Sequence, residues 1–368
     1  MSLKAGIIGL PNVGKSTLFN AITNSHVEAA NYPFATISPN TGVVNVPDER
    51  LDFLSNLFNP KKTIPATCEF TDIAGLVKGA SKGEGLGNQF LSHIRQCDAL
   101  VEVVRCFENS DIIHVENSVD PIRDIEIINL ELCLADLDSV TKRLAKVETK
   151  ARVGKDKEAI FETDILTKLK NVLEQGIAAR RAQLNEEQKK FVNDTYFLLT
   201  MKPILYVANV GEEDLSSLDD NQHYLALKKY ANDEGSNVIP VSCQIESELS
   251  LLSKEEKNEY LEALGVTYSG LDLVIKATYE LLNLSTFFTV GADECKAWTF
   301  INGMNAPECA GVIHTDFKKG FIRAEVYSYD AIKLHGSELA VKEAGKLKVE
   351  GKDYLPKDGD IMFFRFNV

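Results

Sequence analysis

The sequence predicts an α/β fold in which a mostly parallel sheet carries helices on both faces. Three features of the 368-residue chain support this prediction. Short apolar runs alternate with helical patterns over the first 120 residues, a glycine-rich loop separates the first strand from the first helix, and apolar runs return after residue 200. The pattern changes in the middle of the chain and in its tail, so we also expect a helical insertion and a second, smaller domain.

The predicted elements of the first domain alternate as strand and helix. The first strand is expected at Ala5–Gly9 and the first helix at Lys15–Asn24, and a later amphipathic helix covers about Gly270–Leu284. The other apolar runs predict strands at Gly42–Val46, Cys68–Ile73, Ala99–Arg105, Pro203–Ala208 and Asn237–Val241. Short strands separated by helices are typical of βαβ units, which place their strands in parallel.

Residues 122–197 interrupt this pattern. Apolar side chains recur at helical spacing from Ile127 to Val147 and again from Ile165 to Leu173, with Gly154 in a polar turn between them. We therefore expect a long antiparallel helical hairpin inserted in a domain of residues 1–283. The tail, residues 284–368, has strand-like runs and a Pro-Lys-Asp-Gly turn, which predict a separate α+β domain.

Composition limits the class of protein. The formal net charge is −14, so the chain as a whole repels phosphate polymers and a nucleic-acid partner would need a local basic patch. The seven cysteines are scattered without a C-x-x-C pair, which suggests reduced, buried thiols. No run of the sequence has the length of a signal peptide core or a membrane span, so we expect a soluble, cytoplasmic protein with no membrane partner.

Residues 9–16 form the most specific motif of the chain. The run Gly9-Leu10-Pro11-Asn12-Val13-Gly14-Lys15-Ser16 matches G-x-x-x-x-G-K-[ST] and lies between a predicted strand and a predicted helix. Backbone N–H groups of such a loop bind phosphate oxygens. We therefore expect the nucleotide to contact Asn12, Val13, Gly14, Lys15, Ser16 and Thr17. Lys15 supplies a cation to the β- and γ-phosphates, and the Ser16 hydroxyl is a ligand for Mg²⁺. The motif predicts a phosphate loop.

Two further segments fit a magnesium and γ-phosphate site. Asp72-Ile73-Ala74-Gly75 ends a predicted strand, so Asp72 can hold Mg²⁺ through water and Gly75 can donate its N–H to the γ-phosphate. Thr36 lies in the loop between the first helix and the second strand and can close on the metal ion. The alternative for Thr36 is an ordinary surface threonine.

The base-binding segment departs from the guanine pattern. Where a GTPase has N-K-x-D, this chain has Asn209-Val210-Gly211-Glu212, so the carboxylate is one methylene longer and valine replaces lysine. A pocket selective for guanine depends on the carboxylate that accepts two of its hydrogens, so we expect a preference for ATP. Ser242 and Cys243 follow the next strand and complete the predicted pocket. The alternative is that residues 209–212 are only a loop and the base binds elsewhere.

Together these segments resemble the Obg-like ATPases of the YchF type. The resemblance is carried by residues 9–17, 31–36, 72–81 and 209–212, and in the tail by residues 313–324. It implies that the helical insertion is the coiled-coil arm of that family and that the tail is its TGS domain, a β-grasp module. It also implies preferential binding of ATP, slow hydrolysis to ADP and phosphate, and association with ribosomes.

The catalytic glutamine of many GTPases is missing. The residue after D-x-x-G is Leu76, which cannot orient the attacking water, so intrinsic hydrolysis should be slow. The resemblance implies His114 as the substitute, a histidine in a mobile loop that swings toward the γ-phosphate. The alternative is a solvent-exposed loop histidine without a catalytic role.

The tip of the predicted hairpin is basic. Between residues 142 and 157, two acidic residues, Glu148 and Asp156, oppose seven basic ones: Lys142, Arg143, Lys146, Lys150, Arg152, Lys155 and Lys157. A projecting basic tip can contact ribosomal RNA phosphates, although the bland alternative is a solvated helical face. Three functions stay open: an ATPase switch on the translation machinery, a GTPase assembly factor, and a nucleotide-gated ribosome-binding protein with incidental turnover.

Overall fold

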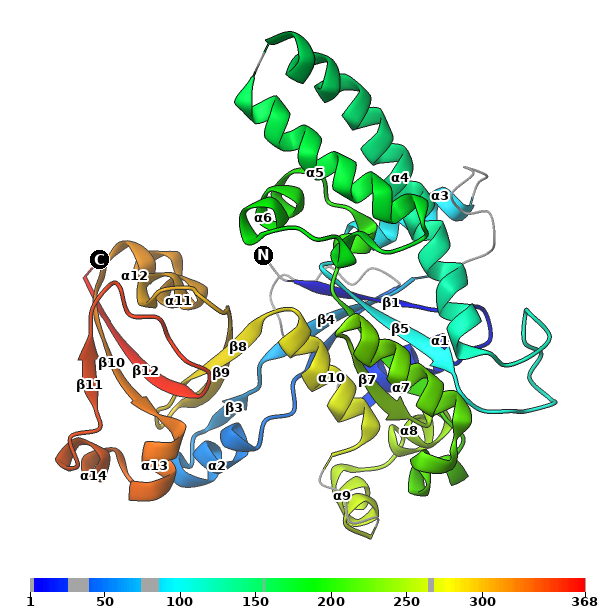
Figure 1. Ribbon diagram of the computed structural model, residues 1–368. Coiled ribbons are helices and arrows are strands. Elements are labelled where there is room, and N and C mark those ends of the chain that lie inside the picture. Colours follow the sequence, from blue (N-terminus) through cyan, green and yellow to red (C-terminus); the bar gives the residue numbers. More distant parts are fainter. Residues whose placement is uncertain (1–2, 26–39, 74–85, 155, 264–267, 368) are drawn as a thin grey trace. The chain divides into compact units, whose positions relative to one another are not determined.

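The computed structural model describes residues 3–25, 40–73, 86–154, 156–263 and 268–367. The chain forms two compact units, each made of two segments (Figure 1). One unit contains Met1–Gly42 and Glu69–Val274, and the other contains Val43–Cys68 and Ile275–Val368. The sequence pattern, which set a boundary at residue 284, did not show that residues 43–68 belong with the C-terminal segment.

The first unit is built on a six-stranded sheet with the order β2-β4-β1-β5-β6-β7. The ladders that join β4, β1, β5, β6 and β7 are all parallel. The strands are β1 (Lys4–Ile8), β2 (Thr41–Asn45), β4 (Thr67–Asp72), β5 (Ala99–Arg105), β6 (Ile204–Asn209) and β7 (Asn237–Val241). Every residue of β5 and β6 is buried, as expected for central strands of a sheet covered on both faces. The predicted fold class is confirmed.

Helices of the first unit surround this sheet and extend from it. They are α1 (Lys15–Ser25), α3 (Leu86–Arg95), α4 (Pro121–Gly154), α5 (Lys157–Glu174), α6 (Glu186–Thr195), α7 (Gln222–Glu234), α8 (Cys243–Leu249) and α9 (Lys254–Ala263). Short 3₁₀ helices lie between them: η2 (Ala179–Arg181), η3 (Leu199–Met201), η4 (Glu213–Ser216) and η5 (Leu218–Asp220). None of the helices in the described ranges is long and apolar enough to span a bilayer.

Helices α4 and α5 form an arm, which Figure 1 shows as two long helices side by side. Helix α4 has Pro121 at its first position, where proline costs no hydrogen bond, and continues for 34 residues. Buried apolar residues of both helices, including Val147, Ile165 and Leu169, form their common core. The chain then returns through η2 and α6, whereas the sequence predicted a hairpin continuing to residue 197. This return is fastened by Asp136, which accepts hydrogen bonds from backbone N–H groups at 2.9 and 2.8 Å.

A buried polar cluster joins the return segment of the arm to α7 and the sheet. Arg180 donates to one carboxylate oxygen of Glu234 at 2.5 Å, and the Tyr206 hydroxyl donates to the other at 2.6 Å. Glu102 lies close to this pair, fully buried, and its two carboxylate oxygens have no hydrogen-bond partner among the described residues. Burial raises the pKa of Glu102 well above its ordinary value, because a neutral acid costs less to bury than a carboxylate.

The second unit contains another six-stranded sheet, with the order β11-β10-β12-β8-β9-β3. The sheet is mixed, since β12–β8 and β3–β9 are parallel and the other described ladders are antiparallel. Its strands are β3 (Lys62–Ile64), β8 (Leu284–Thr289), β9 (Glu294–Ile301), β10 (Phe321–Ser328), β11 (Lys348–Glu350) and β12 (Asp360–Phe366). The remaining helices are α2 (Glu49–Phe58), α10 (Gly270–Leu281), α11 (Ala306–Ile313), α12 (Thr315–Lys319), α13 (Tyr329–His335) and α14 (Glu338–Glu343).

Helix α2 and strand β3, which come from the N-terminal part of the chain, are an integral part of this second unit. Strand β3 pairs with β9, and Lys62 is opposite Glu294. Arg50 on α2 lies 2.5 Å from a carboxylate oxygen of Asp358 and over the ring of Phe288. The C-terminal sheet is therefore completed by a segment from the N-terminal part of the chain.

All seven cysteines are buried and none forms a disulfide, which agrees with the prediction of reduced, buried thiols. Burial raises the pKa of Cys97 to about 11, so its thiol stays protonated at neutral pH.

Candidate active site

The predicted phosphate loop connects β1 to α1. Gly14 has a φ of +99°, and a Cβ atom at this position would lie 2.4 Å from the side-chain nitrogen of Asn209, so only glycine fits. Asn12 has a φ of 63°, a left-handed conformation that asparagine tolerates better than most residues. Helix α1 begins at Lys15, and the free N–H groups of its first turn therefore lie at the end of the loop. This is the backbone arrangement of an anion site.

Lys15 and Asp72 meet beside this loop. The Lys15 ammonium lies 3.3 Å from Oδ1 of Asp72, the last residue of β4, and Lys15 is only 8 % exposed. The structure thus brings together the two predicted charged residues, which are far apart in the sequence. A Mg²⁺–nucleotide site uses both groups: a lysine ammonium binds the phosphates, and a carboxylate binds the metal ion.

The oxygen donors near the loop fit a metal ion that arrives with a nucleotide. Within the described ranges, no group of three or more His, Cys, Asp or Glu residues is arranged to hold a metal. Mg²⁺ is commonly held by one or two protein oxygens together with substrate phosphates and water. The exposed Ser16 at the start of α1 and the carboxylate of Asp72 supply such oxygens. Thr36, Gly75 and Leu76 lie outside the described residues.

A cavity of about 950 Å³ opens beside the phosphate loop. Its walls come from the loop itself and from segments that follow β5, β6 and β7, whose carboxyl ends meet at one edge of the sheet. The predicted contacts that line it are Asn12, Gly14, Thr17, Asn209, Val210, Glu212, Ser242 and Cys243. The cavity is large enough for a nucleoside, since small-molecule sites are commonly about 300 to 1,000 Å³.

Asn209 acts mainly as a brace within this cavity. Its side-chain nitrogen donates to the Val13 carbonyl at 2.8 Å, and its side-chain oxygen accepts from the Cys243 N–H at 3.1 Å. The Cys243 N–H is therefore already used within the protein. Val210 is buried, and its N–H donates to the Val241 carbonyl. Of residues 209–212, Glu212 has the exposed side chain that can reach a base.

One wall of the cavity was missed by sequence reasoning. It consists of residues after β5, chiefly Phe107, Glu108 and Ile112, and of His223 at the start of α7. His223 lies 3.4 Å from a carboxylate oxygen of Glu108. The position of β5 could have predicted this wall from the sequence, because residues just after a central parallel strand lie at the edge of the sheet where ligands bind.

Arg105 shapes the loop formed by residues 106–119, here called the His114 loop. The buried guanidinium donates to the carbonyl oxygens of Phe107, Asn109 and Ile112, each at 3.0 Å. It also lies over the Phe107 ring, 4.6 Å from the ring centre. Burial lowers the pKa of Arg105, and the three carbonyl acceptors offset part of the cost of removing this cation from water. One side chain thus fixes the first half of the loop.

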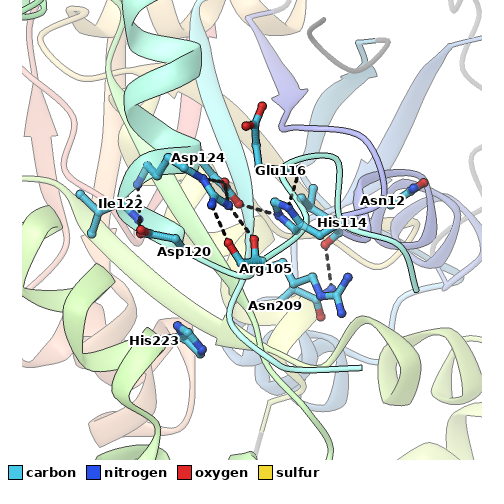
Figure 2. A network of polar contacts seen from close by, with 12 residues as sticks. Asn12, Arg105, His114, Glu116, Asp120, Ile122, Asp124, Asn209 and His223 are labelled. Atoms are coloured by element: carbon cyan, nitrogen blue, oxygen red, sulfur yellow. Dashed lines mark hydrogen bonds and ion pairs between the residues drawn. The ribbon is translucent and has the colours of Figure 1, made fainter. Parts of the chain in front are cut away.

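His114 is buried and hydrogen-bonded in the structure, so it is not the solvent-exposed loop histidine of the alternative. The residue is 6 % exposed, its Nε2 atom lies 2.8 Å from Oδ2 of Asp124, and its Nδ1 atom accepts from the Glu116 N–H at 3.1 Å (Figure 2). The neighbouring Ile113 carbonyl accepts from the Asn12 side chain at 3.1 Å, which ties the loop to the phosphate loop. The histidine is therefore near the predicted site but held in place.

The basic tip of the arm is weaker than the sequence count indicated. Three of its cations form ion pairs: Lys142 with Asp138, Arg143 with Glu162, and Arg152 with Glu148. Asp138 and Glu162 lie outside residues 142–157. Asp138 reaches Lys142 along α4, and Glu162 reaches Arg143 across from α5. Lys146, Lys150 and Lys157 are exposed and form no salt bridge with described residues, and Lys155 lies outside the described ranges.

Known proteins resemble this chain over its whole length. It is 56 % identical to the ribosome-binding ATPase YchF of Bacillus subtilis and 51 % identical to that of Escherichia coli O157:H7, with full coverage of both partners. The rat Obg-like ATPase 1 is 49 % identical over all of this chain and 93 % of its own length. The solved structure of the Schizosaccharomyces pombe YchF GTPase has a TM-score of 0.88 and 41 % identity, covering 99 % of this chain and 98 % of that one.

Two family models match separate parts of the sequence. Residues 4–135 match a family described as 50S ribosome-binding GTPase. Residues 284–367 match the C-terminal domain of YchF GTPases, which is described as a protein of unknown function.

Proposed function

Because the chain belongs to the YchF family of Obg-like ATPases, we propose that it is a magnesium-dependent ATP hydrolase that acts as a nucleotide switch on ribosomes. The observation that carries this proposal is the contact between Lys15 and Asp72 beside the phosphate loop, next to a cavity of nucleoside size. The ribosome is the partner named for the bacterial relatives, and this name supports a site of action in the cytoplasm.

Each residue of the proposed site has a defined task in hydrolysis. Lys15 and the N-terminus of α1 bind the β- and γ-phosphates. Ser16, Asp72 and Thr36 would hold the magnesium ion, which would neutralise charge on the phosphates, and Gly75 would donate its N–H to the γ-phosphate. Asn209 keeps the phosphate loop and the β7–α8 connection in register. His114 orients the attacking water, the task for which Leu76 has no suitable group.

The choice between ATP and GTP needs a direct test, since relatives are named both as ATPases and as GTPases. We expect ATP to bind at least roughly tenfold more tightly than GTP, a difference of about 1.4 kcal/mol. The physical reason is that Glu212 does not reproduce the aspartate that accepts two hydrogens from guanine. Competition between the two nucleotides for the purified protein measures the ratio, and equal affinities or a preference for GTP would contradict the assignment of Glu212.

Substitution at the base pocket sharpens this test. Val210→Lys with Glu212→Asp restores the guanine pattern and should shift the preference toward GTP. Val210 is buried, so the lysine also costs stability, and Glu212→Asp alone serves as the matched variant that leaves the buried position intact.

We infer that the arm contacts ribosomal RNA through the three lysines that form no salt bridge, Lys146, Lys150 and Lys157. Replacing all three with glutamate should reduce co-sedimentation with ribosomes and flatten its dependence on salt concentration, because fewer phosphate contacts release fewer counterions. Lys190→Glu on α6 is the control for a charge reversal outside the tip, since this lysine is exposed. If the triple variant sediments like the parent, the tip is only a solvated helical face.

A second candidate function is a nucleotide-gated ribosome-binding protein whose turnover is incidental. The bonded state of both His114 ring nitrogens favours it, because a histidine in that state orients no water. Sedimentation with ribosomes in the presence of ATP, of ADP and of no nucleotide separates the candidates. Binding that follows the nucleotide state while turnover stays negligible, even with ribosomes, would support the second.

A further inference from the structure

We propose that Asp124 is a positioning residue that restrains His114 in a catalytically disengaged position. The inference rests on the proposed role of His114 in hydrolysis and adds a means of controlling it. It is carried by the contacts of the His114 ring, by the fixed position of Asp124, and by the place of Asp124 on the arm helix (Figure 2).

The two ring contacts define the state of the imidazole. Nδ1 of His114 faces the Glu116 N–H, so this nitrogen carries no proton and acts as the acceptor. The proton of the neutral ring is then on Nε2, which donates to Oδ2 of Asp124 at 2.8 Å. Both nitrogens are used, and neither is left to accept a proton from water or to donate to phosphate. Before His114 orients a water molecule, at least one of these contacts has to break.

Asp124 is itself held firmly. Its side chain is 4 % exposed, and its other oxygen, Oδ1, accepts from the Arg123 guanidinium at 2.9 and 3.2 Å. The same guanidinium donates to the hydroxyl of Ser118 at 2.8 Å, at the end of the His114 loop. The carboxylate therefore reaches the ring from a fixed place, and it is the stronger of the two ring contacts because its acceptor is charged.

The restraint belongs to the arm. Asp124 lies in the first turn of α4, the helix that continues for 34 residues to the arm tip. Its backbone N–H bonds to the Asp120 carbonyl, so the residue moves with the helix. A shift of the start of α4 relative to the His114 loop lengthens the contact between Asp124 and His114. A partner bound to the arm can therefore release the histidine without touching the nucleotide cavity.

Asp124→Ala tests the restraint in the full-length protein with ATP and magnesium. The expected result is a turnover number raised roughly three- to tenfold, with an unchanged KM for ATP, because the charged acceptor that competes for the ring is removed. Asp120→Ala is the matched control. Asp120 accepts from the N–H groups of Ile122 and Arg123 and caps the same helix, but its side chain forms no hydrogen bond or ion pair with His114. This control should keep the parental turnover.

The double variant Asp124→Ala, His114→Ala separates the restraint from the proposed function. A gain that disappears in the double variant supports the restraint. If His114→Ala alone hydrolyses ATP at the parental rate, the proposed role of His114 is wrong. If His114→Ala is slow and Asp124→Ala is unchanged or slower, His114 is catalytic but Asp124 does not restrain it, and the inference is overturned.

Nitrogen NMR of the histidine ring reports its tautomer and the exchange of its proton, and a change in stability alone does not alter the tautomer. The parental protein should show His114 as the Nε2–H tautomer with a slowly exchanging proton, and that protection should be lost in Asp124→Ala. Asp124→Asn is used if the alanine variant fails to fold, since the amide oxygen keeps a neutral acceptor. The turnover number of Asp124→Asn should lie between that of the parent and that expected for Asp124→Ala. A parental ring without a protected Nε2 proton would overturn the inference.

Discussion

Replacing Lys15 with alanine is expected to abolish measurable ATP hydrolysis and to weaken nucleotide binding. The ammonium is nearly buried beside the phosphate loop and is placed to neutralise the charge that develops between the β- and γ-phosphates. Positioned cations and donors of this kind commonly contribute about 10²- to 10³-fold or more to turnover. The variant also leaves Asp72 without its ion-pair partner, so the effect on metal binding adds to the effect on phosphate. Single-turnover hydrolysis and equilibrium nucleotide binding measure the two effects separately.

Lys4→Ala is the matched control for this experiment. Lys4 lies on the same strand–loop–helix segment, at the beginning of β1, and its side chain forms a partly exposed ion pair with Glu69. Loss of that pair should change activity very little, since it lies at the start of the strand, away from the phosphate loop, and partly exposed ion pairs contribute little to stability. Near-normal hydrolysis in Lys15→Ala would show that residues 9–16 are not the phosphate site.

Replacing His114 with alanine is expected to lower the turnover number by roughly 10²-fold, the range that positioned acid–base groups supply. ATP affinity should hardly change, because the histidine acts only when the γ-phosphate is already bound. The limb of the pH–rate profile that belongs to the imidazole should disappear in the variant. Steady-state kinetics over a range of pH, with ATP binding measured alongside, tests all three statements.

His223→Ala is the control for this second variant. His223 lines the same cavity but lies beside Glu108 at the wall that follows β5, so it should affect ATP affinity rather than turnover. Removing the buried His114 ring also removes its packing, and thermal unfolding shows whether the loss of activity reflects a loss of folded protein. If His114→Ala binds ATP poorly, the residue has a structural role in the loop.

The central features of the fold could be predicted from the sequence because they depend on local patterns. Buried parallel strands are continuous apolar runs, and the predicted strands of the first sheet lie within one residue of the observed ones, for example β5 at Ala99–Arg105. The phosphate loop was predictable because its backbone demands glycine at Gly14 and a lysine and a serine at fixed spacing.

The remaining features depend on contacts between distant residues, which a single sequence does not show. Strand β3 has three residues and half-exposed or exposed side chains, so neither its existence nor its pairing with β9 has a local signal. The hydrogen bond at Nε2 of His114 is formed with Asp124, which belongs to a different element. The weak charge of the arm tip depends on pairing across the two helices, such as that of Arg143 with Glu162.

The divided second unit has a consequence for how the nascent chain matures. Lys62 is synthesised long before its partner Glu294, and at ordinary elongation rates the interval is on the order of tens of seconds. Throughout that time the edge of β3 and the apolar face of α2, with Leu51 and Leu54, have no C-terminal sheet to cover them. Such long-range pairing is slow to form and prone to misassembly while it waits. A fragment cut at residue 283 would remain permanently in this unfinished condition, so the two units cannot be exchanged between proteins as simple cassettes.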